Sequence, residues 1–169
     1  MDISVQLNLK KSKLKTIYPK FNQNNNTWKV YVNTEGEIKI KDKIYPYLFW
    51  EGESYFINEI NEGFIVKDEN AEEFLEEKLK LLGLNDKEST DFITFWLPVL
   101  LKNKLSLCYF QSEEYFENYE LNISPKPDSI IRIFLSIKKI NSPIKIKEQK
   151  LISNERKGFT VVEWGGTNI

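Results

Sequence analysis

The chain contains no histidine and a single cysteine, Cys108. A Ser-His-Asp or Cys-His nucleophilic site is therefore excluded, because the imidazole that would shuttle the proton is missing. A zinc site is not expected either, since its usual ligands are thiolates and imidazoles. The sequence also has no glycine-rich phosphate loop. We therefore expect no cofactor and no metal, and any acid–base chemistry would have to come from Asp, Glu, Lys or Tyr.

Long hydrophobic runs are also missing. No stretch approaches the ~20 apolar residues that cross a bilayer, and residues 1–13 lack the basic-then-apolar order of a secretion signal. Cys108 lies in the apolar run 105–110, which predicts a buried and unreactive thiol. A lone cysteine also fits a reducing compartment. These features predict a soluble, cytoplasmic protein without a membrane partner.

The charges are distributed unevenly along the chain. Residues 1–47 contain nine lysines and four acidic residues, whereas residues 48–92 contain four lysines and thirteen acidic residues. The N-terminal lysines at positions 10, 11, 13, 15 and 20 could contact phosphate, but lysines of this kind more often protect the edge of a sheet. The sequence pI of about 5.7 argues against a nucleic-acid partner.

The periodicity of the hydrophobic residues predicts an α+β fold in one domain, residues 1–169. In the first part of the chain, hydrophobic residues recur in the pattern of short strands at residues 3–9, 28–32, 38–40 and 44–50. The short connections between these stretches indicate an antiparallel β meander or sandwich. A helical hairpin is inserted at about residues 70–102. The strands then resume at residue 105.

The helical hairpin has readable ends. Asn70 with Glu73, and Asn85 with Glu88, predict a capping box at the start of each helix. Gly83 fits a left-handed stop between the helices. Pro98 should kink the second helix or end it early, because proline lacks a backbone donor.

The second half of the chain predicts further strands and the connections between them. Residues 105–111 are apolar enough for a central strand, and residues 112–118 read as a loop or short helix. The turn sequence at residues 125–128, PKPD, predicts a hairpin between residues 121–123 and the alternating run 129–138. Residues 159–164 predict the last strand, which Gly165 and Gly166 should end.

Two short motifs place a tryptophan beside a glutamate at the end of an apolar strand, and a glycine follows. They contain Trp50 and Glu51 in the first case and Glu163 and Trp164 in the second. If the two strand ends met, the glutamates could form a carboxylate pair of the kind that hydrolyses glycosides. The commoner arrangement is that such tryptophans are core anchors, with the glutamates capping or paired to lysines. We treat these four residues as the candidate binding site.

A second candidate surface is aromatic. Trp28, Tyr31, Tyr45 and Tyr47 could form a platform on which sugars or bases stack. Alternating aromatic residues on strands more often pack in a core.

Several longer stretches resemble a family of uncharacterised microbial proteins. They read YPYLFWEG at residues 45–52, FWLP at 95–98, ISPKPDS at 123–129 and ERKGFTVVEWGG at 155–166. Members of the family often carry a KPVIYLYP segment before the first strand, which does not occur in these 169 residues. The resemblance implies that both tryptophan motifs belong to one unit. It implies no activity and assigns no catalytic residue.

Together these observations favour a non-enzymatic binding or structural domain that contacts a protein partner through the strand ends near Trp50 and Trp164. The alternative is a carboxylate-based glycan hydrolase, with Glu163 as the acid and Glu51 as the base or nucleophile. The sequence does not decide whether the chain is an enzyme.

Overall fold

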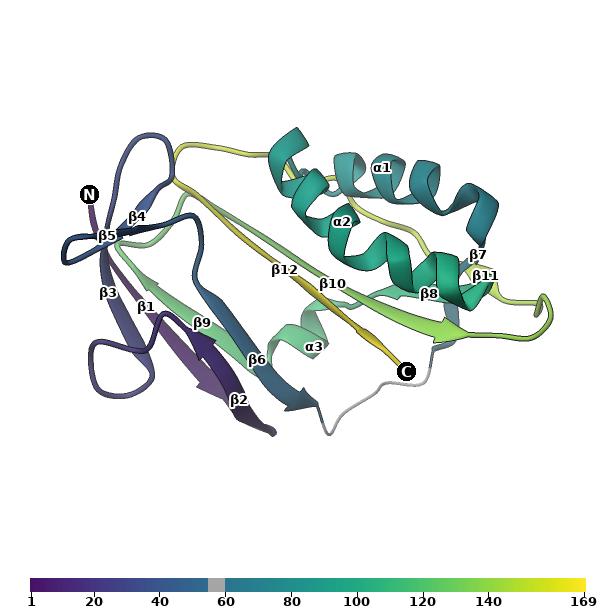
Figure 1. Ribbon diagram of the computed structural model, residues 1–169, viewed down its shortest axis with the longest axis horizontal. Coiled ribbons are helices and arrows are strands. Elements are labelled where there is room, and N and C mark those ends of the chain that lie inside the picture. The colour runs from purple at the N-terminus through teal and green to yellow at the C-terminus, as the bar shows by residue number, and fades with distance from the viewer. Residues whose placement is uncertain (55–59) are drawn as a thin grey trace. The chain divides into compact units, whose positions relative to one another are not determined.

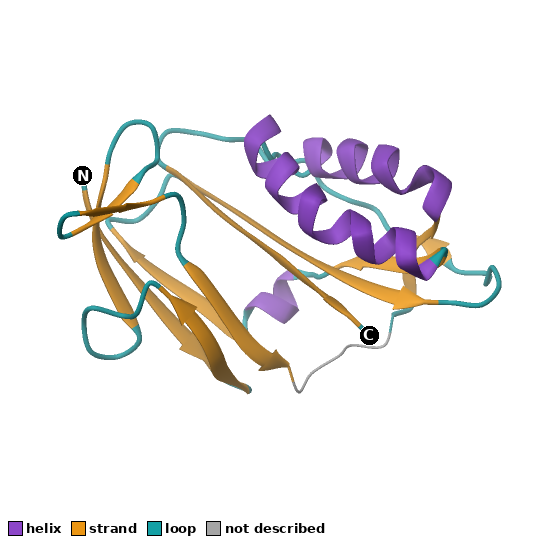
Figure 2. Cartoon of the chain, in the orientation of Figure 1, coloured by secondary structure: helices purple, strands orange, loops and turns teal. Residues whose placement is uncertain are grey.

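The computed structural model describes residues 1–54 and 60–169 and has an α+β fold (Figure 1). Most strand pairs are antiparallel, and two adjacent helices form a hairpin (Figure 2). The chain forms two compact units. Unit 1 comprises Met1–Asn58 and Ser112–Pro127, and unit 2 comprises Glu59–Gln111 and Asp128–Ile169. That residues 1–169 behave as one domain stays a prediction, and each unit is described by itself.

Unit 1 consists mainly of strands. Its elements are β1 (Asp2–Leu9), β2 (Ser12–Tyr18), β3 (Thr27–Val32), β4 (Ile38–Ile40), β5 (Lys43–Tyr45), β6 (Phe49–Ser54), the short helix α3 (Glu113–Phe116) and β9 (Tyr119–Ser124). One sheet has the order β5-β4-β3-β1-β9, and β2 pairs separately with β6. The expected meander therefore holds for β3, β4 and β5, whereas β1 lies between β3 and β9. The single strand expected at residues 44–50 is wrong, because this stretch is divided between β5 and β6 of different sheets.

Alternation along β1 and β3 explains the core of unit 1. Leu7 of β1 and Trp28 and Val30 of β3 are buried, while Lys29 and Tyr31 point to the opposite, exposed face. The indole N–H of Trp28 donates to the Pro19 carbonyl at 2.8 Å, so the ring has its polar group satisfied inside the unit.

Unit 2 is a sheet with a helical hairpin. Its elements are β7 (Glu62–Lys67), a 3₁₀ turn η1 (Asp68–Asn70), α1 (Ala71–Leu81), α2 (Asp86–Asn103), β8 (Leu105–Phe110), β10 (Ser129–Lys139), β11 (Lys147–Glu148) and β12 (Thr160–Asn168). The sheet order is β11-β7-β8-β10-β12, with β10 parallel to β12 and β11 parallel to β7. Residues of both helices pack with residues of β7, β8 and β10 in one buried cluster. Strand β8 is thus central, as predicted. Within the described residues, no helix is long and apolar enough to span a membrane.

The ends of the helical hairpin are only partly as predicted. The capping box of α2 is present: the Glu88 amide donates to the Asn85 side chain and the Asn85 amide donates to Glu88, both at 2.9 Å. Gly83 has φ +94°, and the bonds Gly83 N to Lys80 O and Leu84 N to Leu79 O form a Schellman ending. The capping box at Asn70 is wrong, because Asn70 closes η1 and lacks the extended backbone that a side-chain cap needs.

Three further expectations are corrected. Of the two outcomes expected at Pro98, a kink or an early end, the early end is wrong: α2 continues to Asn103, and Trp96 and Leu100 on either side of Pro98 are buried. The hairpin across residues 125–128 does not form, because β9 pairs with β1 while β10 pairs with β8 and β12. Strand β12 does not end at Gly165 and Gly166 but runs through them to Asn168.

Candidate functional site

The first tryptophan–glutamate motif lies on β6 in unit 1. Glu51 accepts a hydrogen bond from Thr16 Oγ1 at 3.1 Å and pairs with Lys15 Nζ at 3.5 Å, both on the neighbouring strand β2. Trp50 is half-buried, and its ring centroid lies 5.8 Å from that of Tyr119. Within unit 1, Trp50 of this motif therefore packs against another aromatic ring, and Glu51 is paired with residues of the neighbouring strand.

The second motif lies on β12 in unit 2. Glu163 is directly opposite Arg132 of β10, and Arg132 Nε donates to Glu163 Oε2 at 2.5 Å. The two side chains are only 15% and 17% exposed. Trp164, on the other face of the strand, packs against the core with its ring 5.3 Å from Phe92. Trp164 is thus partly buried against the core of unit 2, and its role in binding stays a prediction.

The two glutamates belong to different units, and each is engaged by a cation of its own unit. The structure therefore gives no geometry for the carboxylate pair that glycoside hydrolysis would need. The use of Glu51 and Glu163 as a catalytic pair stays a prediction.

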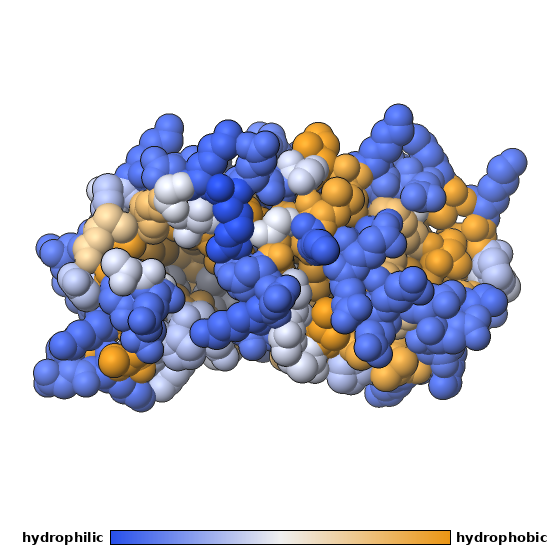
Figure 3. Space-filling view, turned by 90° about the horizontal axis from the view of Figure 1, so that it is seen from above, coloured by the Kyte–Doolittle hydropathy of each residue, from blue (hydrophilic) through white to orange (hydrophobic). Residues whose placement is uncertain are grey.

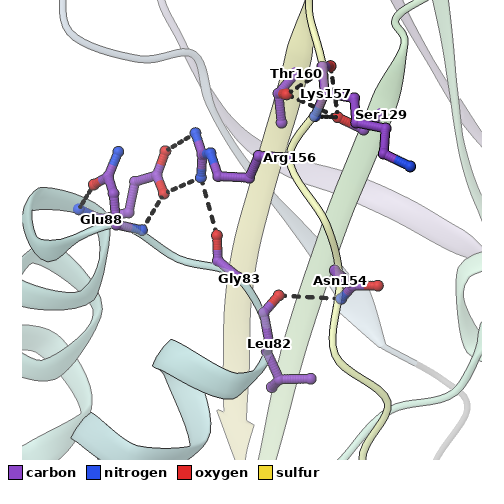
Figure 4. A network of polar contacts seen from close by, with 9 residues as sticks. Leu82, Gly83, Glu88, Ser129, Asn154, Arg156, Lys157 and Thr160 are labelled. Carbon is purple, nitrogen blue, oxygen red and sulfur yellow. Dashed lines mark hydrogen bonds and ion pairs between the residues drawn. The ribbon is translucent and has the colours of Figure 1, made fainter.

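The segment that joins β11 to β12 is hydrogen-bonded to the helical hairpin through Asn154 and Arg156, and we call these contacts the clasp (Figure 4). The guanidinium of Arg156 donates to both carboxylate oxygens of Glu88, at 2.7 and 3.1 Å, and to the Gly83 carbonyl at 3.1 Å. The Asn154 side chain donates to the Leu82 carbonyl at 3.1 Å. Glu88 is itself the second partner, after Asn85, in the capping box of α2. Arg156 therefore joins a helix cap, a helix stop and the sheet connection by charge-assisted hydrogen bonds.

The same segment is fixed where it enters β12. Ser129 Oγ accepts from the Lys157 amide at 3.1 Å, and the hydroxyls of Ser129 and Thr160 lie 2.7 Å apart (Figure 4). The Phe159 amide donates to Asp128 Oδ2 at 2.7 Å. Gly158 has φ +49°, and a side chain there would collide with Asp128. The polar groups of the ERKGF stretch are thus used within unit 2, which indicates a structural role for this motif.

The single thiol is withdrawn from solvent. Cys108 lies fully buried in the core of unit 2, and burial raises its pKa to about 12. The predicted burial of the cysteine is confirmed, and the inertness of its thiol stays a prediction. Within residues 1–54 and 60–169, no three Cys, Asp or Glu side chains gather closely enough to hold a metal ion.

Unit 1 exposes a group of aromatic side chains that we call the aromatic surface. It comprises Tyr18, Tyr45 and Phe49 together with Lys43, and we include the exposed Tyr47, which lies in the short connection between Tyr45 and Phe49. Tyr18 lies directly opposite Phe49 across β2 and β6, so the two rings share one face. The rings of Tyr18 and Tyr45 meet edge to face at 5.7 Å. Tyr18, Tyr47 and Phe49 remain 53%, 57% and 41% exposed.

Lys43 contacts two rings of the aromatic surface, those of Tyr18 and Tyr45. Its Nζ donates to the Tyr18 hydroxyl at 3.0 Å and lies 5.6 and 5.0 Å from the ring centroids of Tyr18 and Tyr45. The hydrogen bond to Tyr18 raises the pKa of Lys43 above its usual value. The ammonium is therefore charged at neutral pH and links two rings by cation–π contacts.

The sequence identified part of this surface. Tyr45 and Tyr47 belonged to the expected platform, whereas Trp28 of that platform is buried in the core. Tyr31 is exposed, but it lies in a separate hollow of unit 1. Tyr18 and Phe49 were missed, because only the pairing of β2 with β6, distant in sequence, places them together.

Comparison of the chain with known protein families, with curated proteins and with solved structures finds no match. The resemblance seen in the sequence stays a prediction.

Proposed function

We propose that the chain is a non-enzymatic binding domain that recognises a protein partner through the aromatic surface of unit 1. One observation carries the proposal: Tyr18 and Phe49 lie opposite each other across β2 and β6, yet 53% and 41% of their surface stays exposed to water. Tyrosine and phenylalanine are enriched where proteins meet, because they bury a large apolar area, and tyrosine retains a polar group.

The arrangement also lowers the cost of binding. Lys43 and the edge-to-face contact hold Tyr18 and Tyr45 in place before any partner arrives. Side chains that are already ordered lose less conformational entropy on association. Aromatic rings with two side-chain torsions are suited to this role. The rings of Tyr18 and Tyr45 are therefore arranged for contact in advance.

The chemistry of the surface indicates the kind of partner. The rings fit an apolar side chain of the partner, and the Lys43 ammonium fits a carboxylate or carbonyl acceptor beside it. Exposed hydrophobic residues also occur outside the aromatic surface, among them Phe95 and Ile152 of unit 2, and the face shown in Figure 3 carries hydrophobic groups between hydrophilic residues. Apolar residues that are exposed singly are normal and call for no partner.

The alternative, a glycan hydrolase using Glu51 and Glu163, has less support. Each carboxylate is engaged by a lysine or arginine of its own unit, and Glu163 is largely buried. The hydrolase alternative would be supported if Glu51→Gln or Glu163→Gln abolished an identified hydrolytic activity.

Affinity capture with matched variants tests the proposal. The bait would be the wild type, the double variant Tyr47→Ser/Phe49→Ser and the control Phe95→Ser, which removes an exposed aromatic of unit 2. We expect a protein that the wild type and Phe95→Ser retain and the double variant loses, followed by direct binding of that protein in purified form. Identical protein sets for all three baits would contradict the proposal.

A further inference from the structure

A second feature of unit 1, on the exposed face of β3, is a hollow that we call the basic hollow. Its volume is about 610 Å³, within the usual range for small-molecule sites. The lining residues that matter for its chemistry are Asp2, Gln23, Lys29, Tyr31, Lys39 and Lys41. None of them belongs to the aromatic surface, so the two features can be tested separately.

Strand register explains why these side chains gather around one ring. Tyr31 lies directly opposite Lys39 of β4 on one side and Asp2 of β1 on the other. Lys29 precedes Tyr31 by two positions and therefore points to the same face. Tyr31 is 49% exposed, so one ring with cations and a carboxylate around it is open to solvent.

The base of the hollow is fixed by a loop. Asn22 accepts from the Lys29 amide at 2.7 Å and donates to the Lys29 carbonyl at 2.8 Å. These bonds hold the residues before β3 against the strand and place Gln23 in the lining. The Gln23 side chain has no hydrogen-bond partner among the described residues, and Lys29, Lys39 and Lys41 form no ion pair there.

We propose that the basic hollow binds an anionic sugar, of the uronic-acid type, with its ring stacked on Tyr31. Apolar C–H groups of a pyranose face fit an exposed aromatic ring, and the ammonium groups of Lys29, Lys39 and Lys41 attract the sugar carboxylate. The Asp2 carboxylate and the Gln23 amide accept hydrogen bonds from sugar hydroxyls.

Two features favour a sugar over single-stranded nucleic acid. Nucleic-acid grooves stack successive bases on several rings, whereas the lining of this hollow contains the ring of Tyr31 alone. The Asp2 carboxylate, opposite Tyr31, accepts hydrogen bonds from hydroxyl groups, of which a sugar has more than a nucleic-acid backbone. The proposal is independent of the protein-binding role, because it concerns other residues and another ligand.

The test is a titration of the ¹⁵N-labelled chain with a galacturonic acid trisaccharide, followed by amide chemical shifts. We expect saturable shifts at Lys29, Tyr31 and Lys39 that weaken with added salt. Tyr31→Ala should weaken binding by at least about tenfold, as loss of a stacking ring does. Tyr31→Phe should retain it. Lys39→Gln should weaken binding, whereas the exposed lysine variant Lys126→Gln in the same unit should not.

Several outcomes would overturn the assignment. Equal binding of the neutral methyl ester would show that the lysines do not select the carboxylate. Tighter binding of a thymidine oligonucleotide would assign the hollow to nucleic acid, and sulfate binding that is unaffected by Tyr31→Ala would assign it to a simple anion. Absence of saturable binding at millimolar trisaccharide, with a folded spectrum, would also contradict it. Tyr47→Ala should leave sugar binding intact, which separates this test from that of the aromatic surface.

Discussion

Gly166 of β12 lies against the indole ring of Trp96 on α2: a Cβ at this glycine would stand 2.7 Å from Cζ2 of the ring. It would also stand 2.6 Å from the Leu135 carbonyl of the neighbouring strand β10. The buried indole N–H of Trp96 has no hydrogen-bond partner among the residues described, so the ring is held by packing. The second glycine of the GG pair therefore exists for close approach of a helix to the sheet.

This relationship predicts that Gly166→Ala destabilises unit 2 by about 1–3 kcal/mol, because the added methyl overpacks a site bounded by backbone. Gly165→Ala is the matched control, since its Cβ would meet only the Phe134 ring, at 3.3 Å. Denaturant unfolding of both variants measures the difference. A loss of stability for Gly165→Ala as large as that for Gly166→Ala would contradict the packing role of Gly166.

The Arg132–Glu163 ion pair should stabilise the fold more than the exposed ion pairs of the chain do, because both of its side chains are largely withdrawn from water. Glu163→Gln is expected to lower the free energy of unfolding by about 2 kcal/mol, since it weakens a hydrogen bond between charged groups. A double-mutant cycle with Arg132→Met isolates the pair from the other contacts of each residue. A coupling energy near zero would show that the pair is not structural and would revive a functional role for Glu163.

The clasp at Arg156 predicts a difference between two basic residues that are adjacent in sequence. Arg156→Lys should cost about 0.5–1 kcal/mol, because a lysine cannot bridge both Glu88 oxygens and the Gly83 carbonyl. Lys157→Arg should be neutral, since Lys157 pairs with Glu155 at a site where both side chains are about three-quarters exposed. Chemical denaturation distinguishes the two, and equal effects would argue against the clasp.

The burial of Cys108 predicts how the stability of the fold depends on pH. Its pKa is raised from 9.0 to about 12 by burial, so above pH 9 the unfolded chain loses this proton before the folded chain does. The contribution of the buried thiol to stability is therefore complete below pH 9 and declines as the pH rises toward 12. Stability measured against pH should fall less steeply in Cys108→Ala than in the wild type. Iodoacetamide should modify the native thiol far more slowly than the denatured one; rapid native modification would contradict the burial.

Local signals in the sequence predicted local structure well. Alternation separated buried Trp28 from exposed Lys29, and the spacing of Asn85 and Glu88 identified the capping box of α2. Asn70 carries the same spacing but fails, because η1 precedes it and fixes its backbone outside the extended region. Pro98 shows the opposite case, in which the packing of flanking residues outweighs a missing backbone donor.

Pairings between distant strands could not be predicted in the same way. The PKPD turn contains every local feature of a hairpin, yet β9 and β10 pair with other strands on either side of it. The pairing of β2 with β6 is what places Tyr18 beside Phe49, and no short motif encodes it. The four residues predicted as a site were chosen from local motifs, and the structure divides them between the two units. The proximity of Tyr18 and Phe49 depends instead on a tertiary contact.

The most direct test of the account is the dissociation constant of the captured partner, measured by calorimetry with purified proteins. The wild type and Phe95→Ser should bind equally, and Tyr47→Ser/Phe49→Ser should bind at least about tenfold more weakly, as expected when buried aromatic contacts are removed. The single substitution Lys43→Met should also weaken binding relative to the wild type when the partner supplies a carboxylate to the ammonium. Unchanged affinity for the double variant, or loss of affinity on Phe95→Ser alone, would contradict the claim that unit 1 recognises its partner through the aromatic surface.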